Sequence, residues 1–441
     1  MTKKVVSLVR YEEPYQSVRK AVLDCGGFDH LPAKARVFIK PNIVFWTRAC
    51  TFPKWGVITT SRVIEDMVIL LKEYGIEDIT IGEGIVADPS DKKTPAHAFE
   101  SLGYALLKKR YGVKYINIME RPFRRIDLGE GISLKYNADI LESDFLVNLP
   151  VLKSHNQTVV SLGLKNLKGV IDIPSRKKCH SADPQKDLHY HVSKIADPMP
   201  PSLTVIDGIY SLEKGPAFDG RMRRSNLLVA STDMLSADLV GSKILGYDPV
   251  DVGHLAHAAN SSKRPLDLSD VEIIGENVEE AASFHQYDFE YISDESGEMP
   301  KALAKQGLQG IFYRKFDQTM CTYCSALNGL VLTAIRQAWQ GEPWDNIEVL
   351  TGKAMEPSKG MTATLLIGQC MYNKNKDHPD IQKMFAAKGC PPDPQEIVDS
   401  LNDAGIAVDP ALFSQVDQLP GFFMSRYEGN PDFEESFFQV N

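Results

Sequence analysis

The sequence predicts an α/β protein with a doubly wound, mostly parallel sheet and a smaller C-terminal α/β module that carries a group of cysteines. Three observations indicate this architecture. Short apolar segments alternate with amphipathic segments in the order strand, helix, strand through residues 1–277. Polar residues recur directly after the apolar segments, where the carboxyl ends of parallel strands would meet. Four cysteines lie in the C-terminal third of the chain, one of them between Gly389 and Pro391 and another two residues after Gly368.

Composition limits the class of protein. A chain of 441 residues is too long for one small core and predicts two or three domains. Its formal net charge of -9 argues against general nucleic-acid binding, which requires a basic face. No apolar run reaches the ~18–20 residues of a membrane-spanning helix, and the N-terminal segment lacks the apolar core of a signal peptide. Seven cysteines without a dense framework favour reduced thiols in a cytoplasm.

The elements of the first 150 residues follow from periodicity and from capping and stop signals. Ser61 is the expected N-cap of the second helix, and Gly75 is expected to end it. Gly82 and Gly84 follow a strand, but no third glycine completes a dinucleotide-binding fingerprint, so we interpret them as a tight turn. The predicted strands are residues 5–9, 35–39, 78–81, 115–119, 132–136 and 144–149, and the predicted helices are residues 17–25, 62–74 and 94–111.

The rest of the chain divides into the end of this domain, a linker and a second module. Strands are predicted at residues 202–206, 227–230 and 271–275. Asp207 and Asp233 should lie at the carboxyl ends of strands, and helix capping is the alternative role of Asp233. We therefore expect an α/β domain at residues 1–277, an acidic linker at residues 278–310 and a four-cysteine module at residues 311–441.

The polar cluster after the strand at 144–149 is the main candidate for a ligand site. Open α/β sheets bind ligands at the carboxyl ends of their strands. Lysine, histidine and amide side chains there suit a carboxylate, a phosphate or an enolate. The alternative is a basic, solvated loop without a ligand. The candidate catalytic residues are His155, Lys153 and Lys165, and the candidate substrate-binding residues are Lys40, Asn42, Thr59, Asn166, Lys168 and Asp207.

The segment that follows, residues 174–196, is charged and predicted to be rich in loops. It contains three histidines and Cys179, which could coordinate a metal, but their spacing fits no common zinc pattern. We interpret it as a mobile loop that covers the substrate. Cys50 and Cys179 are expected in loops near the ligand site, where a thiol could be reactive, and we assign neither a role.

Cys321, Cys324, Cys370 and Cys390 can hold one 4Fe-4S cluster or a tetrahedral zinc. Cys321 and Cys324 open an apolar helix predicted at residues 325–339, so the positive end of the helix dipole faces their thiolates. Zinc ribbons usually use two CxxC pairs, and this sequence has one. We therefore favour a 4Fe-4S cluster, with zinc or purely structural thiols as the alternatives.

Seven motifs recur along the first part of the chain: Val37–Asn42, Thr59–Thr60, Ile81–Gly84, Leu146–Val170, Asp207–Gly208, Gly215–Pro216 and Ala230–Asp238. Together they resemble the domain-of-unknown-function 362 family. The resemblance covers residues 1–275 and implies an α/β fold and often a 4Fe-4S cluster, but no settled reaction.

Two weaker resemblances involve other parts of the chain. The Gly-Cys-Pro-Pro at residues 389–392 resembles cluster-binding small subunits of hydrogenases and respiratory NADH dehydrogenases, whose other cysteines are spaced differently. The lysine- and histidine-rich cluster is remotely similar to lactate-racemase-like proteins, from which we carry over no residue.

These patterns predict a cytoplasmic iron–sulfur reductase of anaerobic metabolism that acts on an anionic small molecule. His155 would donate a proton, because its unperturbed pKa lies near neutrality, and the lysines would stabilise negative charge on the substrate. A ferredoxin- or flavodoxin-type protein is the expected electron donor, and a homodimer is a candidate assembly. One alternative is an isomerase, racemase or lyase in which the cluster is structural. The other is a non-enzymatic electron-transfer or cluster-carrier protein.

Overall fold

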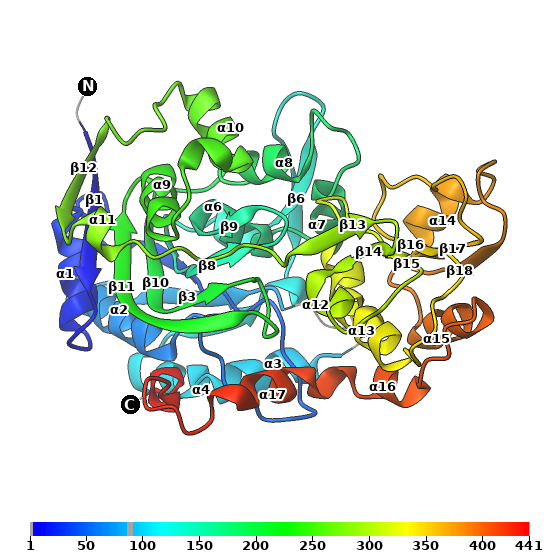
Figure 1. Ribbon diagram of the computed structural model, residues 1–441. Coiled ribbons are helices and arrows are strands. Elements are labelled where there is room, and N and C mark those ends of the chain that lie inside the picture. The colour runs from blue at the N-terminus through cyan, green and yellow to red at the C-terminus, as the bar shows by residue number, and fades with distance from the viewer. Residues whose placement is uncertain (1–2, 86–90, 441) are drawn as a thin grey trace. The chain divides into compact units, whose positions relative to one another are not determined.

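The computed structural model describes residues 3–85 and 91–440, and the chain divides into two compact units (Figure 1). Unit 1 comprises residues 1–176, 189–288 and 420–441. Unit 2 comprises residues 177–188 and 289–419. Each unit is built on its own sheet of mostly parallel strands with helices connecting them. The predicted α/β fold class is therefore confirmed.

Unit 1 contains a ten-stranded mixed sheet whose main strand order is β12-β1-β11-β10-β7-β2-β3-β4. The strands from β10 to β4 run parallel to one another, whereas β11 is antiparallel to both of its neighbours. Strand β8 pairs with β10 and with β9 beside this path. The strands are β1 (Lys4–Arg10), β2 (Arg36–Lys40), β3 (Asp78–Glu83), β4 (Lys114–Asn117), β7 (Phe145–Asn148), β8 (Val151–His155), β9 (Val159–Ser161), β10 (Ser202–Glu213), β11 (Arg221–Ser231) and β12 (Val271–Gly275).

Helices connect these strands and supply apolar side chains to the core. The predicted helix at residues 94–111 is two helices, because Gly103 adopts a left-handed φ of 79° between them. The side chain of Thr60, not Ser61, caps α2 by accepting a hydrogen bond from Val63 N. The helices are α1 (Gln16–Asp24), α2 (Ser61–Glu73), α3 (Lys93–Ser101), α4 (Tyr104–Tyr111), α5 (Ala138–Leu141), α6 (Gly163–Asn166), α7 (Ile173–Cys179), α8 (Leu188–Lys194), α9 (Met234–Ile244), α10 (Gly253–Ser262), α11 (Val278–Ala281) and α17 (Leu419–Met424).

Smaller elements complete unit 1. Strands β5 (Phe123–Asp127) and β6 (Ser133–Asn137) form a separate two-stranded antiparallel sheet, so β6 is not at the edge of the main sheet. The 3₁₀ segments are η1 (Ile118–Glu120), η2 (Leu167–Val170), η3 (Pro249–Asp251), η5 (Ser425–Tyr427) and η6 (Glu435–Phe438).

Three parts of unit 1 differ from the elements that the sequence predicts. Strands β10 and β11 form a long antiparallel hairpin, with a register shift between Gly208 and Tyr210, so Asp207 lies inside a strand and not at its end. The polar residues after β7 form the β8–β9 hairpin, which contains Lys153 and His155. The segment 174–196, predicted as loops, contains most of α7 and all of α8. Single-sequence periodicity is weak in the short, polar elements β8, β9, α7 and α8. The β10–β11 hairpin depends on cross-strand pairing, which periodicity does not report.

The segment after residue 420 packs on unit 1. Trp55 Nε1 donates a hydrogen bond of 3.1 Å to Glu434 O, and Glu434 N donates one of 2.9 Å to the Tyr210 hydroxyl. The ring of Phe433 lies 5.1 Å from that of Trp55 and 4.5 Å from that of Tyr427. The four-cysteine module that we expected to run to residue 441 thus ends, as a compact unit, at residue 419.

Unit 2 contains a six-stranded sheet in the order β13-β14-β15-β16-β17-β18, parallel except for the β13–β14 pair. The segment 278–310, expected as a linker, contributes β13, β14 and α12 to this unit. The strands are β13 (Tyr291–Asp294), β14 (Gly297–Pro300), β15 (Ile311–Tyr313), β16 (Ile347–Leu350), β17 (Ala363–Ile367) and β18 (Met384–Ala387). The helices are α12 (Lys301–Ala304), α13 (Thr322–Gln337), α14 (Gln369–Asn375), α15 (Pro394–Asp403), α16 (Pro410–Ser414) and the 3₁₀ segment η4 (Val416–Gln418).

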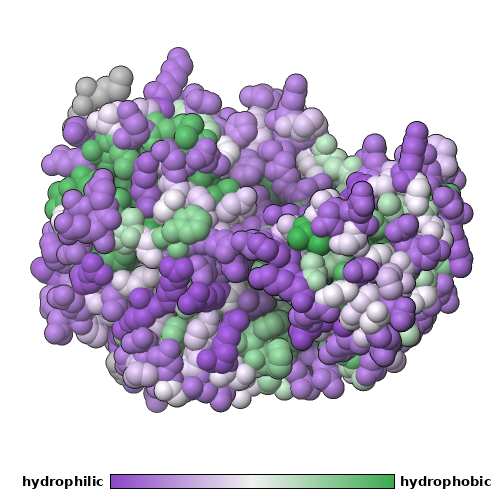
Figure 2. All heavy atoms as spheres, in the orientation of Figure 1, coloured by the Kyte–Doolittle hydropathy of each residue, from purple (hydrophilic) through white to green (hydrophobic). Residues whose placement is uncertain are grey.

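No helix in the described residues is both long and apolar enough to span a membrane. The face of the molecule in Figure 2 is mainly hydrophilic, with apolar side chains in scattered groups.

Candidate functional site

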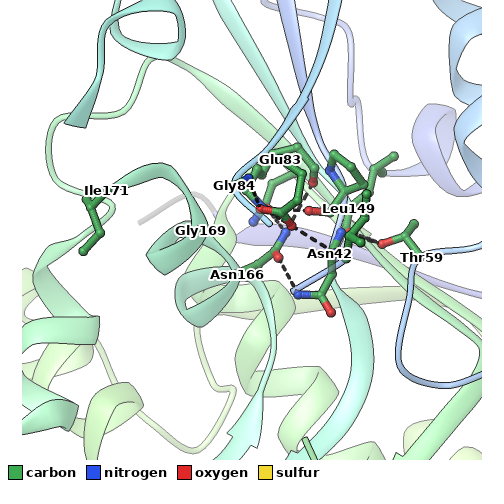
Figure 3. Close-up of polar contacts among 12 residues, drawn as sticks. Asn42, Thr59, Glu83, Gly84, Leu149, Asn166, Gly169 and Ile171 are labelled. Carbon is green, nitrogen blue, oxygen red and sulfur yellow. Dashed lines mark hydrogen bonds and ion pairs between the residues drawn. The ribbon is translucent and has the colours of Figure 1, made fainter. Parts of the chain in front are cut away.

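Lys40 and Glu83 form a buried ion pair where β2 and β3 end. The amine of Lys40 lies 2.8 Å from Glu83 Oε2, and the two side chains are 0% and 2% exposed. Glu83 also accepts backbone hydrogen bonds from Ile43 (3.0 Å) and Gly84 (2.7 Å), as Figure 3 shows in part. Burial lowers the pKa of Lys40, and the negative charge of Glu83 opposes this. The positive charge of Lys40 is therefore neutralised within the fold. The ion pair connects the chain segments at the ends of the parallel strands β2 and β3.

Gly169 lies directly against this ion pair. A Cβ atom at this position would lie 2.7 Å from Glu83 Oε1 and 2.8 Å from Lys40 Nζ. Arg176 fixes the same turn by donating hydrogen bonds of 2.5 Å to Gly169 O and 2.9 Å to Gly84 O. The sequence analysis did not identify Glu83 or Arg176 as part of the site, although Glu83 lies in the Ile81–Gly84 motif.

Lys153, Asn42 and Asn166 form a second group of buried contacts in the same region. Lys153 Nζ donates a hydrogen bond of 2.5 Å to Asn42 Oδ1, and Asn42 Nδ2 donates one of 3.0 Å to Asn166 Oδ1 (Figure 3). Asn42 N donates to the hydroxyl of Thr59, which in turn donates to Leu149 O. Burial lowers the pKa of Lys153 to about 7, although Glu83 opposes the shift. The structure thus brings four predicted site residues together: Lys153, Asn42, Asn166 and Thr59. Their polar atoms form hydrogen bonds to one another or to the backbone.

Asp207 stabilises the backbone of its own hairpin and of the α2 N-terminus. Its carboxylate accepts hydrogen bonds from Thr60 N (2.7 Å) and Ile209 N (3.1 Å). Burial raises its pKa to about 6, and the two backbone hydrogen bonds oppose that shift. Asp233 caps α9 by accepting a hydrogen bond from Ser236 N (2.8 Å) and pairs with Arg264. Of the two roles weighed for Asp233, helix capping is the one that the structure shows.

His155 is the last residue of β8 and is buried, with 5% of its surface exposed. Its Nδ1 accepts a hydrogen bond of 3.0 Å from Gln157 N. The neutral ring therefore carries its proton on Nε2, which makes that atom a hydrogen-bond donor.

Lys165 lies at the end of the short helix α6 and is half-buried. Asp238 holds the start of this helix by accepting hydrogen bonds from Gly163 N (2.7 Å) and Leu164 N (2.8 Å). Within residues 3–85 and 91–440 the structure records no hydrogen bond or ion pair of the Lys165 amine. Burial, and then the positive charges of Lys168 and Lys153, hold the pKa of Lys165 well below its ordinary value.

His254 is a second buried basic group near Lys165, and sequence reasoning missed it. It lies on α10, none of it is exposed, and neither ring nitrogen has a hydrogen-bond partner in the described residues. Its ring stacks on that of His189 at 5.6 Å. Burial, together with the positive charges of His189 and Lys165, holds its pKa well below the ordinary value. A single histidine on a helix gave no sequence signal for this position.

The four candidate cluster cysteines occupy one region of unit 2. Cys321 is the N-cap of the 16-residue helix α13, and Cys324 lies in its first turn. Cys370 is on α14, directly after β17, and Cys390 follows β18. A Cβ atom at Gly368 would lie 3.4 Å from the Cys324 sulfur, so the turn after β17 approaches the α13 thiols closely. Cys321 is buried, whereas Cys370 and Cys390 are exposed.

Two lysines accompany these thiols. Lys177, which belongs to unit 2, donates a hydrogen bond of 3.1 Å to the Cys390 sulfur and lies 4.8 Å from the centre of the Tyr323 ring. Burial opposes its charge, but the hydrogen bond to Cys390 raises its pKa overall. Lys353 donates a hydrogen bond of 2.8 Å to Lys177 O, and its positive charge acts on Cys321 and Cys370.

The thiols also act on each other. The hydrogen bond with Cys324 lowers the pKa of Cys321, and the same bond, burial and the charges of Cys321, Cys390 and Cys370 raise the pKa of Cys324. Within the described residues, however, no three His, Cys, Asp or Glu side chains lie close enough to hold a single metal ion. The four sulfurs therefore share one region with wider spacing than the ligands of one ion require.

Comparison with known protein families identifies the domain that contains Lys40, Lys153 and Lys165. Residues 37–243 match the model of a family described as Domain of unknown function (DUF362). The chain contains a DUF362 domain. This domain includes Lys40, Lys153, His155 and Lys165, so the resemblance predicted from their motifs is confirmed. The four candidate cluster cysteines and His254 lie outside the matched residues.

Two further proteins are similar to this chain. A thylakoid-associated protein of Synechocystis sp., sll1697, is 26% identical over 263 residues, which cover 57% of this chain and 78% of the relative. The apoprotein structure of lactate racemase from Thermoanaerobacterium thermosaccharolyticum aligns with a TM-score of 0.39 and 10% identity, over 96% of this chain and 82% of the racemase. A likeness this weak carries no residue role or activity to the DUF362 domain.

Proposed function

We propose that this protein is a redox enzyme that carries one 4Fe-4S cluster on Cys321, Cys324, Cys370 and Cys390 and reduces an anionic small molecule bound at the DUF362 domain. The observation that carries the proposal is the gathering of four thiols, from three segments of unit 2, near the N-terminus of α13. When bound, a cluster with four thiolate ligands transfers single electrons.

The charges around the thiols suit such a cluster. Four thiolates concentrate negative charge, and Lys177, Lys353 and the positive end of the α13 dipole oppose it. The cysteine pattern also favours a cluster over zinc, because zinc ribbons usually use two CxxC pairs and this chain has one.

The DUF362 domain supplies residues for binding and protonating an anion. Lys165 and Lys168 are both half-buried, and a bound carboxylate or phosphate would offset the effect of burial and of nearby positive charges, which lower the pKa of Lys165. In the neutral ring His155 Nε2 donates a hydrogen bond to a bound anion, and the protonated ring would be the general acid. The contacts among Lys40, Glu83, Asn42 and Asn166 then hold the loops around these groups, because their own polar atoms are already paired. A ferredoxin- or flavodoxin-type protein would supply the electrons.

One observation favours a second candidate, an isomerase, racemase or lyase. Lys165 and His254 are basic side chains without a hydrogen-bond partner in the described part of the chain, and such groups suit acid–base chemistry that needs no electrons. In this case the cluster has a structural role.

The test of the first proposal is anaerobic purification followed by iron and sulfide analysis and absorption spectra before and after dithionite. About four irons and four sulfides per chain, with a visible band that bleaches on reduction, are expected. The Cys390→Ser variant should lose iron, whereas the matched Cys50→Ser variant should keep it. About one zinc per chain without a visible band would contradict the cluster.

Activity separates the remaining candidates. Once a reducible substrate is found, His155→Ala should abolish its reduction and leave the cluster spectrum intact, a result that excludes a pure electron carrier. Activity that persists in a folded Cys321→Ala protein would contradict the reductase and favour acid–base chemistry.

A further inference from the structure

Three buried asparagines connect Lys153 to the start of α6 through a chain of side-chain hydrogen bonds. Asn42 Nδ2 donates a hydrogen bond of 3.0 Å to Asn166 Oδ1, and Asn166 Nδ2 donates one of 2.8 Å to Asn148 Oδ1. Asn148 Nδ2 donates in turn to Gly163 O, at 3.0 Å. At the other end of the chain, Lys153 Nζ donates a hydrogen bond of 2.5 Å to Asn42 Oδ1. The three asparagines are at most 6% exposed, so water does not replace these contacts.

One backbone carbonyl fixes the direction of this asparagine chain. A carbonyl oxygen can only accept, so Asn148 must turn its NH₂ group to Gly163 O and its own oxygen to Asn166. Each amide further along takes the same orientation, and the last one turns its oxygen to Lys153. Gly163 is itself held, because its N–H donates a hydrogen bond of 2.7 Å to Asp238. A reversed chain would leave buried polar groups unpaired, which is costly.

The amine of Lys153 keeps its contacts in both of its protonation states. It donates to Asn42 Oδ1 and, at 3.1 Å, to Val57 O. An uncharged amine has two N–H bonds and the charged form has three, so one proton can leave without the loss of either hydrogen bond. This holds as long as Asn42 presents its oxygen. The charged groups recorded around this amine are Glu83 on β3, Lys40 on β2 and Lys165 on α6.

We propose that Asn148 is a positioning residue, which fixes the direction of the asparagine chain and thereby holds the Lys153 amine ready to exchange one proton. Asn148 is the last residue of β7 and is not among the site residues that the sequence predicts. It acts through Asn166 and Asn42. The inference rests on the proposed role of the DUF362 domain in binding and protonating an anion, and it does not require the cluster.

The test is a pH titration of the Lys153 amine in the full-length protein. The lysines are labelled with ¹³C at Cε, and the NMR signal of Lys153 is identified by its loss in Lys153→Met. Asn148→Leu removes both hydrogen bonds of the amide at similar side-chain size. The remaining amides can then reverse, so that Asn42 turns its NH₂ group to Lys153. We expect the titration midpoint to fall by about one pH unit, because the charged amine loses an acceptor.

Three further variants make the result specific. Asn148→Asp keeps an acceptor for Asn166 Nδ2 and should keep or raise the midpoint. Asn166→Leu breaks the chain one link nearer to Lys153 and should lower the midpoint at least as far as Asn148→Leu does. The matched control is Asn137→Ala, which removes another fully buried asparagine, the N-cap of α5. The control should leave the midpoint unchanged, although the helix loses its cap.

The same titrations include the outcomes that would overturn the proposal. These are an unchanged midpoint in folded Asn148→Leu, and a fall in Asn148→Asp. A fall of equal size in Asn137→Ala would show that general loosening of the fold, and not the asparagine chain, moves the midpoint. If Asn148→Leu does not fold, Asn166→Leu and Asn148→Asp decide the question by the same measurement.

Two measurements on the same samples separate this inference from the proposed function. Iron is determined by analysis, and the binding of inorganic phosphate alone by calorimetry. A lower midpoint in Asn148→Leu, with neither iron nor phosphate bound by the original chain, would support the positioning role and contradict the proposed function. Bound iron and phosphate with an unmoved midpoint would do the reverse.

Discussion

Lys40 and Lys165 are lysines of the same domain in opposite surroundings. Lys40 is fully buried and lies 2.8 Å from Glu83, which also binds two backbone N–H groups. Lys165 is half-buried, its recorded electrostatic neighbours are basic, and no ion pair is recorded for it in the described residues. The lysines of one motif therefore differ in role: the charge of Lys40 is paired within the fold, whereas the structure records no such pair for Lys165 in the described residues.

The largest expected effect comes from breaking the Lys40–Glu83 pair. Glu83→Gln leaves the Lys40 charge buried without its partner and should lower the free energy of unfolding by about 3–5 kcal/mol, as loss of one partner does in buried ion pairs. Denaturant unfolding measures the change. The control is Glu77→Gln, whose pair with Lys72 is exposed and should contribute about 0–1 kcal/mol. Equal losses in the two variants would refute the structural role of the Lys40 pair.

Lys153 provides an intermediate case, seen in the pH dependence of stability. Its pKa is lowered to about 7 in the folded protein, so between pH 7 and about 10 the unfolded chain binds more protons than the folded one. Stability should therefore rise with pH across this window. Lys153→Met should flatten the rise relative to the original chain, measured by denaturant unfolding at several pH values. Parallel curves for the two proteins would contradict a lowered pKa.

Lys177 extends the comparison to a lysine paired with sulfur. Lys177→Met removes a positive charge 3.1 Å from the Cys390 sulfur and should make the proposed cluster harder to reduce. We expect the reduction potential to fall by on the order of 50 mV, close to the ~59 mV that equals a tenfold effect for one electron. A spectroscopic redox titration measures the shift. Lys359→Met changes an exposed lysine of unit 2 and should leave the potential unchanged.

The smallest effect should be that of Lys165→Met on stability. Because no ion pair is recorded for this lysine in the described residues, its removal should change the free energy of unfolding by no more than about 0.5 kcal/mol. Thermal or denaturant unfolding next to the Glu83→Gln variant measures this contrast directly. A loss comparable to that of Glu83→Gln would mean that Lys165 is structural after all.

Local sequence patterns were sufficient to predict the core strands, but not to predict which charged side chains form ion pairs. The apolar runs at residues 35–39 and 144–149 predict β2 and β7, because strands inside a parallel sheet are buried on both faces. The polar motifs around Lys153 and Asn166 also converge as predicted. The partner of Lys40 is 43 residues away on another strand, and no periodicity reports such a contact.

The errors have a similar physical origin. The strands at residues 291–300 are short, polar and near the edge of their sheet, so their composition resembled a linker. His254 gave no signal because its meaning depends on burial beside His189, which is 65 residues earlier in the chain. The amino-acid sequence does not show directly which side chains are buried in contact with each other.

The return of residues 420–441 to unit 1 has a consequence for biosynthesis. Trp55 and Tyr210 bind the backbone of Glu434, so their packing stays incomplete until the ribosome has made all of unit 2. The aromatic side chains of the nascent DUF362 domain therefore stay exposed while unit 2 is synthesised. Chaperones that bind exposed aromatic surface should bind this chain during that interval.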